Sequence, residues 1–156
     1  MLEGKVALVT GAGQGVGQGI ALALAADGAA VAVTGRTLGK LESTCNLIAE
    51  RGGKALPVQC EVKSAESLAS CVDQVVGHFG GLHILVNNAQ EVPLGELHQV
   101  TDEAFTAGFE SGPLATLRMM KLCYPYLKGD GSIINLGSSS AKRWDANGFG
   151  AYAATK

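Results

Sequence analysis

The chain alternates between short, strongly apolar runs and longer stretches in which apolar residues recur at helical spacing. The short runs are rich in β-branched residues, and Gly, Ser, Asn and Asp separate the segments, as is typical of strands joined to helices. The short runs predict strands at Val6–Thr10, Ala30–Thr34, Ala55–Gln59, Ile84–Asn87 and Ser132–Leu136. Helical spacing predicts helices at Gly15–Asp27, Leu38–Arg51, Ser64–Phe79 and Asp102–Lys128.

This alternation predicts the α/β class, with a doubly wound parallel sheet in a single domain over residues 1–156. Each strand is apolar on both faces, as expected of a parallel strand that is covered by helices on both sides. The longest predicted helix contains Gly112-Pro113. Because proline has no N–H and its ring clashes with the carbonyl four residues earlier, we expect an interruption there.

Composition excludes several functional classes. The formal net charge of −2 leaves no basic surface that could neutralise a run of phosphates, so nucleic acid is not expected as a partner. The first residues lack the basic start of a secretory signal, and no apolar run reaches the roughly 18 residues of a membrane span, so we expect a cytoplasmic protein. The four cysteines and three histidines are scattered without metal-ligand spacing, which predicts reduced thiols and no metal site.

The joint between the first strand and the first helix is rich in glycine. It reads T-G-A-G-Q-G-V-G over Thr10–Gly17, with a GxxxGxG spacing through Gly11, Gly15 and Gly17. Glycines let the backbone approach a pyrophosphate, and the N–H groups at a helix start donate to it. A glycine-rich turn without a ligand is the alternative. The expected phosphate contacts are Gly11, Gly13, Gln14, Gly15, Val16 and Gly17.

Two further motifs follow strand ends. Asn87-Asn88-Ala89-Gln90 ends the fourth strand, where polar residues could also form an ordinary turn. After the fifth strand come Ser138 and the pair Tyr152 and Lys156, whose spacing of four puts both side chains on one helix face. A lysine ammonium near a tyrosine stabilises the phenolate, which suits proton transfer. By itself, this pair could also be an ordinary helix face.

Together and in this order, the three motifs resemble those of the classical short-chain dehydrogenase/reductase family. The resemblance implies a Rossmann-type sheet, here cut off after the fifth strand, and hydride transfer between a nicotinamide cofactor and a carbonyl compound or secondary alcohol. It implies that Tyr152 exchanges a proton with the substrate oxygen and that Ser138 hydrogen-bonds this oxygen. Lys156 would assist Tyr152 and bind the nicotinamide ribose. A homodimer or homotetramer is also implied.

The second predicted strand is followed by Arg36, with no carboxylate at the place that would bind a ribose 2′-hydroxyl. Arginine can pair with a 2′-phosphate instead, so NADP(H) is expected rather than NAD(H). A solvated turn residue is the alternative for Arg36. By resemblance, Glu61 and Val62 would contact the adenine, and Asn88 and Ala89 would line the cofactor site.

The chain departs from the family pattern at several positions. Gly112 stands where the family has a catalytic asparagine, and Gln90 replaces a glycine. The chain also stops at Lys156, before the family's last strands and substrate-binding loop, so we expect a portion of a longer protein. These departures leave open a catalytically silent dinucleotide-binding or regulatory protein.

The choice of catalytic serine depends on where the count begins. Counting from Asn135 at the strand end gives Ser138, whereas counting back from Tyr152 gives Ser139. We favour Ser138, because the loop through residues 144–148 can absorb an extra residue more readily than a sheet register can.

Overall fold

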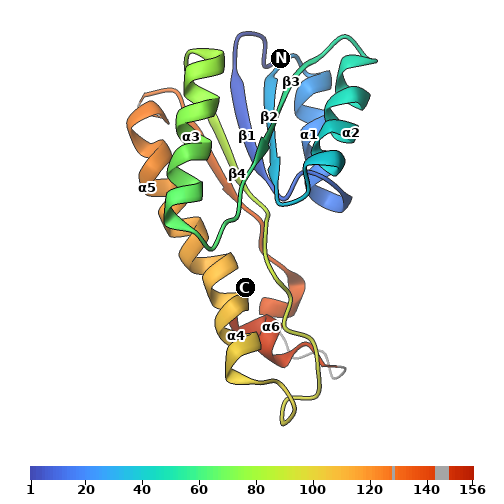
Figure 1. The fold of residues 1–156 in the computed structure, drawn as a ribbon, viewed down its shortest axis with the longest axis vertical. Helices are drawn as coiled ribbons and strands as arrows, with labels where there is room; N and C mark the ends of the chain where they lie inside the picture. Colours follow the sequence, from blue (N-terminus) through green and yellow to red (C-terminus); the bar gives the residue numbers. More distant parts are fainter. Residues whose placement is uncertain (128, 143–147) are drawn as a thin grey trace.

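A computed structural model describes residues 1–127, 129–142 and 148–156. Its parallel strands form one sheet in the order β3-β2-β1-β4-β5 (Figure 1). The strands are β1 (Val6–Thr10), β2 (Ala30–Gly35), β3 (Lys54–Gln59), β4 (Ile84–Asn87) and β5 (Ser132–Asn135). The helices are α1 (Gly15–Ala26), α2 (Leu38–Ala49), α3 (Ala65–Phe79), α4 (Asp102–Phe109), α5 (Ala115–Leu127) and α6 (Gly150–Ala154). A π-helical turn, η1 (Glu110–Leu114), joins α4 to α5, and a 3₁₀ turn, η2 (Ser139–Ala141), follows β5.

Helices cover both faces of the sheet. Helices α1 and α2 lie on one face and α3 and α5 on the other, while α4 and α6 extend beyond the carboxyl ends of the strands (Figure 1). Alternate residues of β1 serve the two cores: Ala7 and Val9 pack towards α1 and α2, and Leu8 packs towards α3 and α5. Burial on both faces explains the unbroken apolar runs and confirms the predicted α/β class.

The strand order reverses between β1 and β4, because the chain adds β2 and β3 on one side of β1 and then β4 and β5 on the other. At such a switch point, the loops after the two central strands diverge and leave a crevice at the carboxyl edge of the sheet. The glycine-rich segment after β1 and the Asn-rich segment after β4 both lie at this edge of the sheet. The fold therefore brings two of the three predicted motifs together.

The helix predicted over residues 102–128 is divided. It runs as α4, then the π-helical turn η1 with Pro113 inside it, then α5, so the expected interruption is confirmed. The wider turn accommodates a residue that cannot donate to the carbonyl four positions earlier. The predicted end of this helix, residue 128, lies outside the described residues.

The two edge strands, β3 and β5, are less buried than the central strands. All four residues of β5 are exposed, with Ile133 41% and Ile134 46% accessible. An edge strand has a hydrogen-bonding partner on one side only, and its apolar surface suits association with another element. Within the part of the chain that the structure describes, no helix is long and apolar enough to cross a membrane.

Candidate functional site

The glycine-rich segment forms a tight loop from β1 into α1. Gly15 has a φ of +60°, a backbone conformation that residues with a side chain rarely adopt. Gly17 is buried so closely against the Gly11 carbonyl and the Asn88 amide that a side chain has no room. Every residue of α1 is described, and its first turn has neither an acidic residue nor a side-chain cap, so its N–H groups remain available to an anion.

Asn88 and Thr10 fix the shape of this loop. The Thr10 hydroxyl oxygen accepts hydrogen bonds from the backbone N–H groups of Asn88 and Ala89, each at 3.0 Å. In return, the Asn88 amide nitrogen donates to the carbonyl oxygens of Thr10 at 2.9 Å and Gly11 at 3.3 Å. The segment after β4 therefore holds the loop after β1 from the opposite side of the crevice.

A cavity of about 310 Å³, here called the glycine-loop cavity, opens between this loop, the end of β2 and the segment after β4. Its lining is Gly11, Gly13, Gln14, Gly15, Gly35, Arg36, Thr37, Lys40, Leu41, Asn88, Ala89 and Gln90. Two predicted contacts are not among them: Val16 is 66% exposed, and Gly17 is buried behind the loop. The unpaired N–H groups at the start of α1 and the Lys40 ammonium fit the pyrophosphate of a dinucleotide.

Lys40 was missed by the sequence analysis. Its ammonium donates a hydrogen bond to the Gln14 side-chain oxygen at 2.6 Å, which places a positive charge beside the phosphate-binding loop. The available signal was a cation in the first turn of the helix that follows Arg36. That signal is weak, because exposed lysines are common at such positions.

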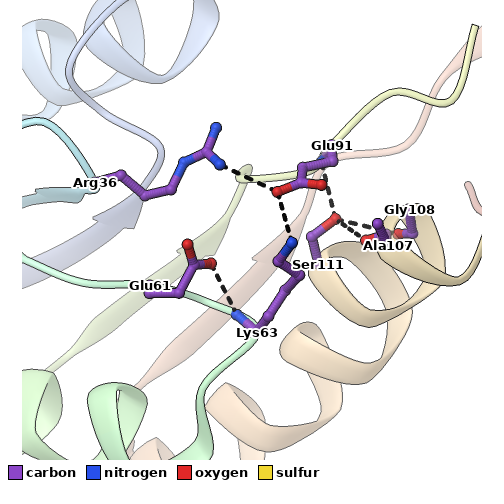
Figure 2. Close-up of polar contacts among 7 residues, drawn as sticks. All are labelled: Arg36, Glu61, Lys63, Glu91, Ala107, Gly108 and Ser111. Carbon is purple, nitrogen blue, oxygen red and sulfur yellow. Dashed lines mark hydrogen bonds and ion pairs between the residues drawn. The ribbon is translucent and has the colours of Figure 1, made fainter. Parts of the chain in front are cut away.

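The exposed Arg36 side chain has an anionic partner. Its guanidinium pairs with the Glu91 carboxylate at 3.1 Å (Figure 2). Arg36 also lines a second opening, together with Gln59, Cys60, Glu61 and Ser67, so Glu61 reaches this opening. Val62 does not, because it is buried in the core on the α3 side of the sheet.

A further cavity of about 230 Å³, here called the lysine cavity, lies on the other side of the segment after β4. It is lined by Asn87, Ala89, Gln90, Gly112, Pro113, Thr116, Asn135, Leu136, Thr155 and Lys156. The Lys156 ammonium donates to the Leu136 carbonyl oxygen at 2.7 Å, and burial lowers the pKa of this ammonium. The structure thus brings Lys156 to the carboxyl end of β5.

Ser138 and Tyr152 lie on neighbouring elements, since α6 packs against η2. The Ser138 hydroxyl caps η2 by accepting from the Ser140 N–H at 3.2 Å, whereas Ser139 is exposed. The half-buried Tyr152 ring packs edge-on against Phe149. The choice between Ser138 and Ser139 used the loop over residues 144–148, of which residues 144–147 lie outside the described part of the chain.

Gln90 and Gly112, noted separately as departures from the family pattern, share one space. A Cβ atom at position 112 would lie 2.9 Å from both the amide carbon and the amide nitrogen of Gln90. The Gln90 amide nitrogen donates to the backbone and hydroxyl oxygens of the buried Thr155, both at 2.9 Å. Gln90 therefore fills the volume that a side chain at position 112 would occupy, and it ties α6 to the segment after β4.

This shared space predicts that substitutions at the two positions are coupled. Gly112→Asn should push the Gln90 amide away from Thr155 and cost about 1–2 kcal/mol of unfolding free energy, and Gln90→Ala should cost a similar amount. In the double variant the amide is already gone, so the cost should fall short of the sum by about 1 kcal/mol. Urea unfolding of all four proteins measures this difference, and strictly additive costs would contradict it.

Comparison with known proteins gives consistent results. Residues 5–156 match the short chain dehydrogenase family. The chain is 35% identical over 156 residues to the short chain dehydrogenase mdpC of Emericella nidulans, covering 99% of this chain and 59% of that protein. A short chain dehydrogenase of Burkholderia cenocepacia, solved in complex with NADP, superposes with a TM-score of 0.94 at 35% identity, covering 99% of this chain and 64% of that one.

A 7α-hydroxysteroid dehydrogenase, solved in complex with NADH and 7-oxo glycochenodeoxycholic acid, superposes with a TM-score of 0.92. It is 28% identical, and the match covers 99% of this chain and 60% of that one. The chain therefore spans about three fifths of the length of the relatives that it matches.

Proposed function

The chain belongs to the short-chain dehydrogenase family, and we propose that it forms the cofactor-binding part of an oxidoreductase. The proposed reaction is hydride transfer between a nicotinamide cofactor and a carbonyl compound or secondary alcohol. NADP(H) is the proposed cofactor.

One observation carries this proposal: the glycine-loop cavity and the lysine cavity adjoin. Ala89 and Gln90 line both of them, so the two cavities flank one short segment at the carboxyl edge of the sheet. An elongated dinucleotide suits this layout, with its pyrophosphate at the start of α1 and its two ends on either side. Arg36 would then bind the adenosine half, and Lys156 would bind the ribose of the nicotinamide half.

The chain's own residues supply proton transfer and positioning. Tyr152 would exchange a proton with the substrate oxygen, and Ser138 would hydrogen-bond this oxygen. Lys156, already fixed by its hydrogen bond to the Leu136 carbonyl, would stabilise the Tyr152 phenolate. The nicotinamide, when bound, supplies or accepts the hydride. A homodimer or homotetramer, which the family resemblance implies, is proposed for the protein of full family length.

The proposed reaction is tested by following nicotinamide absorbance with a panel of ketones and secondary alcohols. Cofactor-dependent turnover of any of these substrates would support an oxidoreductase. The assay should also be made with a protein that has the full length of its relatives. If that protein binds the cofactor without turnover, the catalytically silent alternative is favoured.

Arg36→Ala should weaken NADPH binding about tenfold and leave NADH binding within twofold. A charge-assisted hydrogen bond to a phosphate contributes about 1.5–3 kcal/mol, and the lower end applies because the Arg36 side chain is 63% exposed. Calorimetric titration of both cofactors measures the change. The matched control is Arg51→Ala, an equal loss of charge at an exposed site after α2. Unchanged NADPH affinity in Arg36→Ala would contradict the proposed cofactor preference.

A further inference from the structure

Glu91 lies where two cations converge. One of its carboxylate oxygens accepts from the Arg36 guanidinium at 3.1 Å and from the Lys63 ammonium at 3.0 Å (Figure 2). Arg36 extends from the end of β2, whereas Lys63 precedes α3 and Glu91 follows β4, so the cluster joins three separate loops at the carboxyl edge of the sheet. A single carboxylate therefore serves as the anion for both cations.

The position of Glu91 is fixed by its backbone. Its N–H donates to the hydroxyl oxygen of Ser111 at 2.9 Å, and this hydroxyl donates in turn to the Ala107 carbonyl oxygen at 2.7 Å (Figure 2). Ser111 is buried within the π-helical turn η1. The carboxylate thus projects from a rigid attachment point rather than from a freely moving loop.

Arg36 lies between two openings. Arg36 lines both the glycine-loop cavity and the opening that contains Glu61, and its side chain is 63% exposed. An ion pair of such exposure is weak, because solvent screens it. A phosphate group that entered beside Arg36 would offer more charge and bidentate geometry, and it could displace the carboxylate.

We infer that Glu91 is a specificity-determining residue: its carboxylate competes with the 2′-phosphate of the cofactor for Arg36 and so lowers the preference for NADP(H) over NAD(H). This inference rests on the proposed function. Lys63 makes the exchange feasible, because it keeps Glu91 paired when Arg36 turns towards a phosphate. The hydrogen bond from Lys63 to Glu91 also raises the pKa of Lys63, as pairing with a carboxylate should.

The test uses two probes that differ by one phosphate, 2′,5′-ADP and 5′-AMP, titrated calorimetrically into the chain. Glu91→Gln should tighten 2′,5′-ADP binding about two- to fivefold, the range expected for release of an exposed ion pair. Binding of 5′-AMP should stay within 1.5-fold, roughly the precision at which such small effects are resolved. Glu96→Gln is the matched control, because it is an equal change of charge at an exposed position five residues further along the same loop.

The possible results separate the inference from the function on which it rests. Unchanged or weaker 2′,5′-ADP binding in Glu91→Gln would overturn the inference, since Glu91 would then be neutral or would position Arg36 for the phosphate. Equal tightening in Glu96→Gln would also overturn it, because net charge alone would explain the effect. Failure of the unsubstituted chain to bind either probe would contradict the proposed function itself, and the inference with it.

Discussion

Replacing Gly17 by alanine is expected to lower the free energy of unfolding by about 3 kcal/mol and to abolish detectable dinucleotide binding. A Cβ atom at this position would lie 2.5 Å from the Asn88 amide nitrogen and 2.9 Å from the carbonyl carbon of Gly11. The backbone of Gly11 cannot yield without opening the loop. The Asn88 amide cannot yield without losing its hydrogen bonds to Thr10 and Gly11. The Gly17→Ala variant should therefore lose both unfolding free energy and dinucleotide affinity.

The same helix provides the control. A Cβ atom at Gly19 would meet nothing within 4 Å, and the residue is exposed. Gly19→Ala should therefore raise the unfolding free energy by about 0.5–1 kcal/mol, because alanine favours helix over glycine. Urea unfolding and calorimetric titration of NADPH measure both variants. A Gly17→Ala protein with ordinary stability and ordinary binding would show that the close approach of α1 to the loop is unimportant.

Much of the fold was predictable because its signals are local. Strands β1 and β4 have the predicted bounds, and the other strands differ by a residue at one end. Apolar runs and glycine joints are set within a few residues of the chain, and parallel burial makes the runs continuous. The interruption at Pro113 is likewise predictable from the residue itself, because proline has no N–H to donate within a helix. The exposure of β5 depends on what lies beside the strand rather than on its own residues, which are as apolar as those of a buried strand.

The site was predictable only in part. Residue type and position after β2 single out Arg36, but its ion pair with Glu91 joins positions 55 apart in the chain. The steric competition between Gln90 and a side chain at position 112 was equally hidden, because neither residue alone indicates that the two share one volume. Such pairings arise from tertiary packing, which one sequence does not display. The motifs located the edge of the sheet where the site lies, and the structure supplied the partners.

Tyr152→Phe is expected to reduce turnover about 10²- to 10⁴-fold and to leave cofactor binding within about twofold. The change removes only the hydroxyl and keeps the ring that packs against Phe149, so α6 should stay in place. Loss of a group that transfers a proton in the transition state lowers kcat, whereas loss of a packing contact would also weaken binding. Absorbance assays and calorimetric titration in the protein that carries the full family length separate these two effects.

Tyr126→Phe provides the matched control, because the same hydroxyl is removed from an exposed position on α5, an element other than the α6 that carries Tyr152. It should leave turnover unchanged. If Tyr152→Phe also kept ordinary turnover, Tyr152 would not be the proton-transfer group. If both turnover and cofactor affinity fell together, Tyr152 would act by holding α6, and with it Lys156, in place. Only a selective loss of kcat assigns proton transfer to Tyr152, since it is the one result that neither packing nor cofactor affinity can produce.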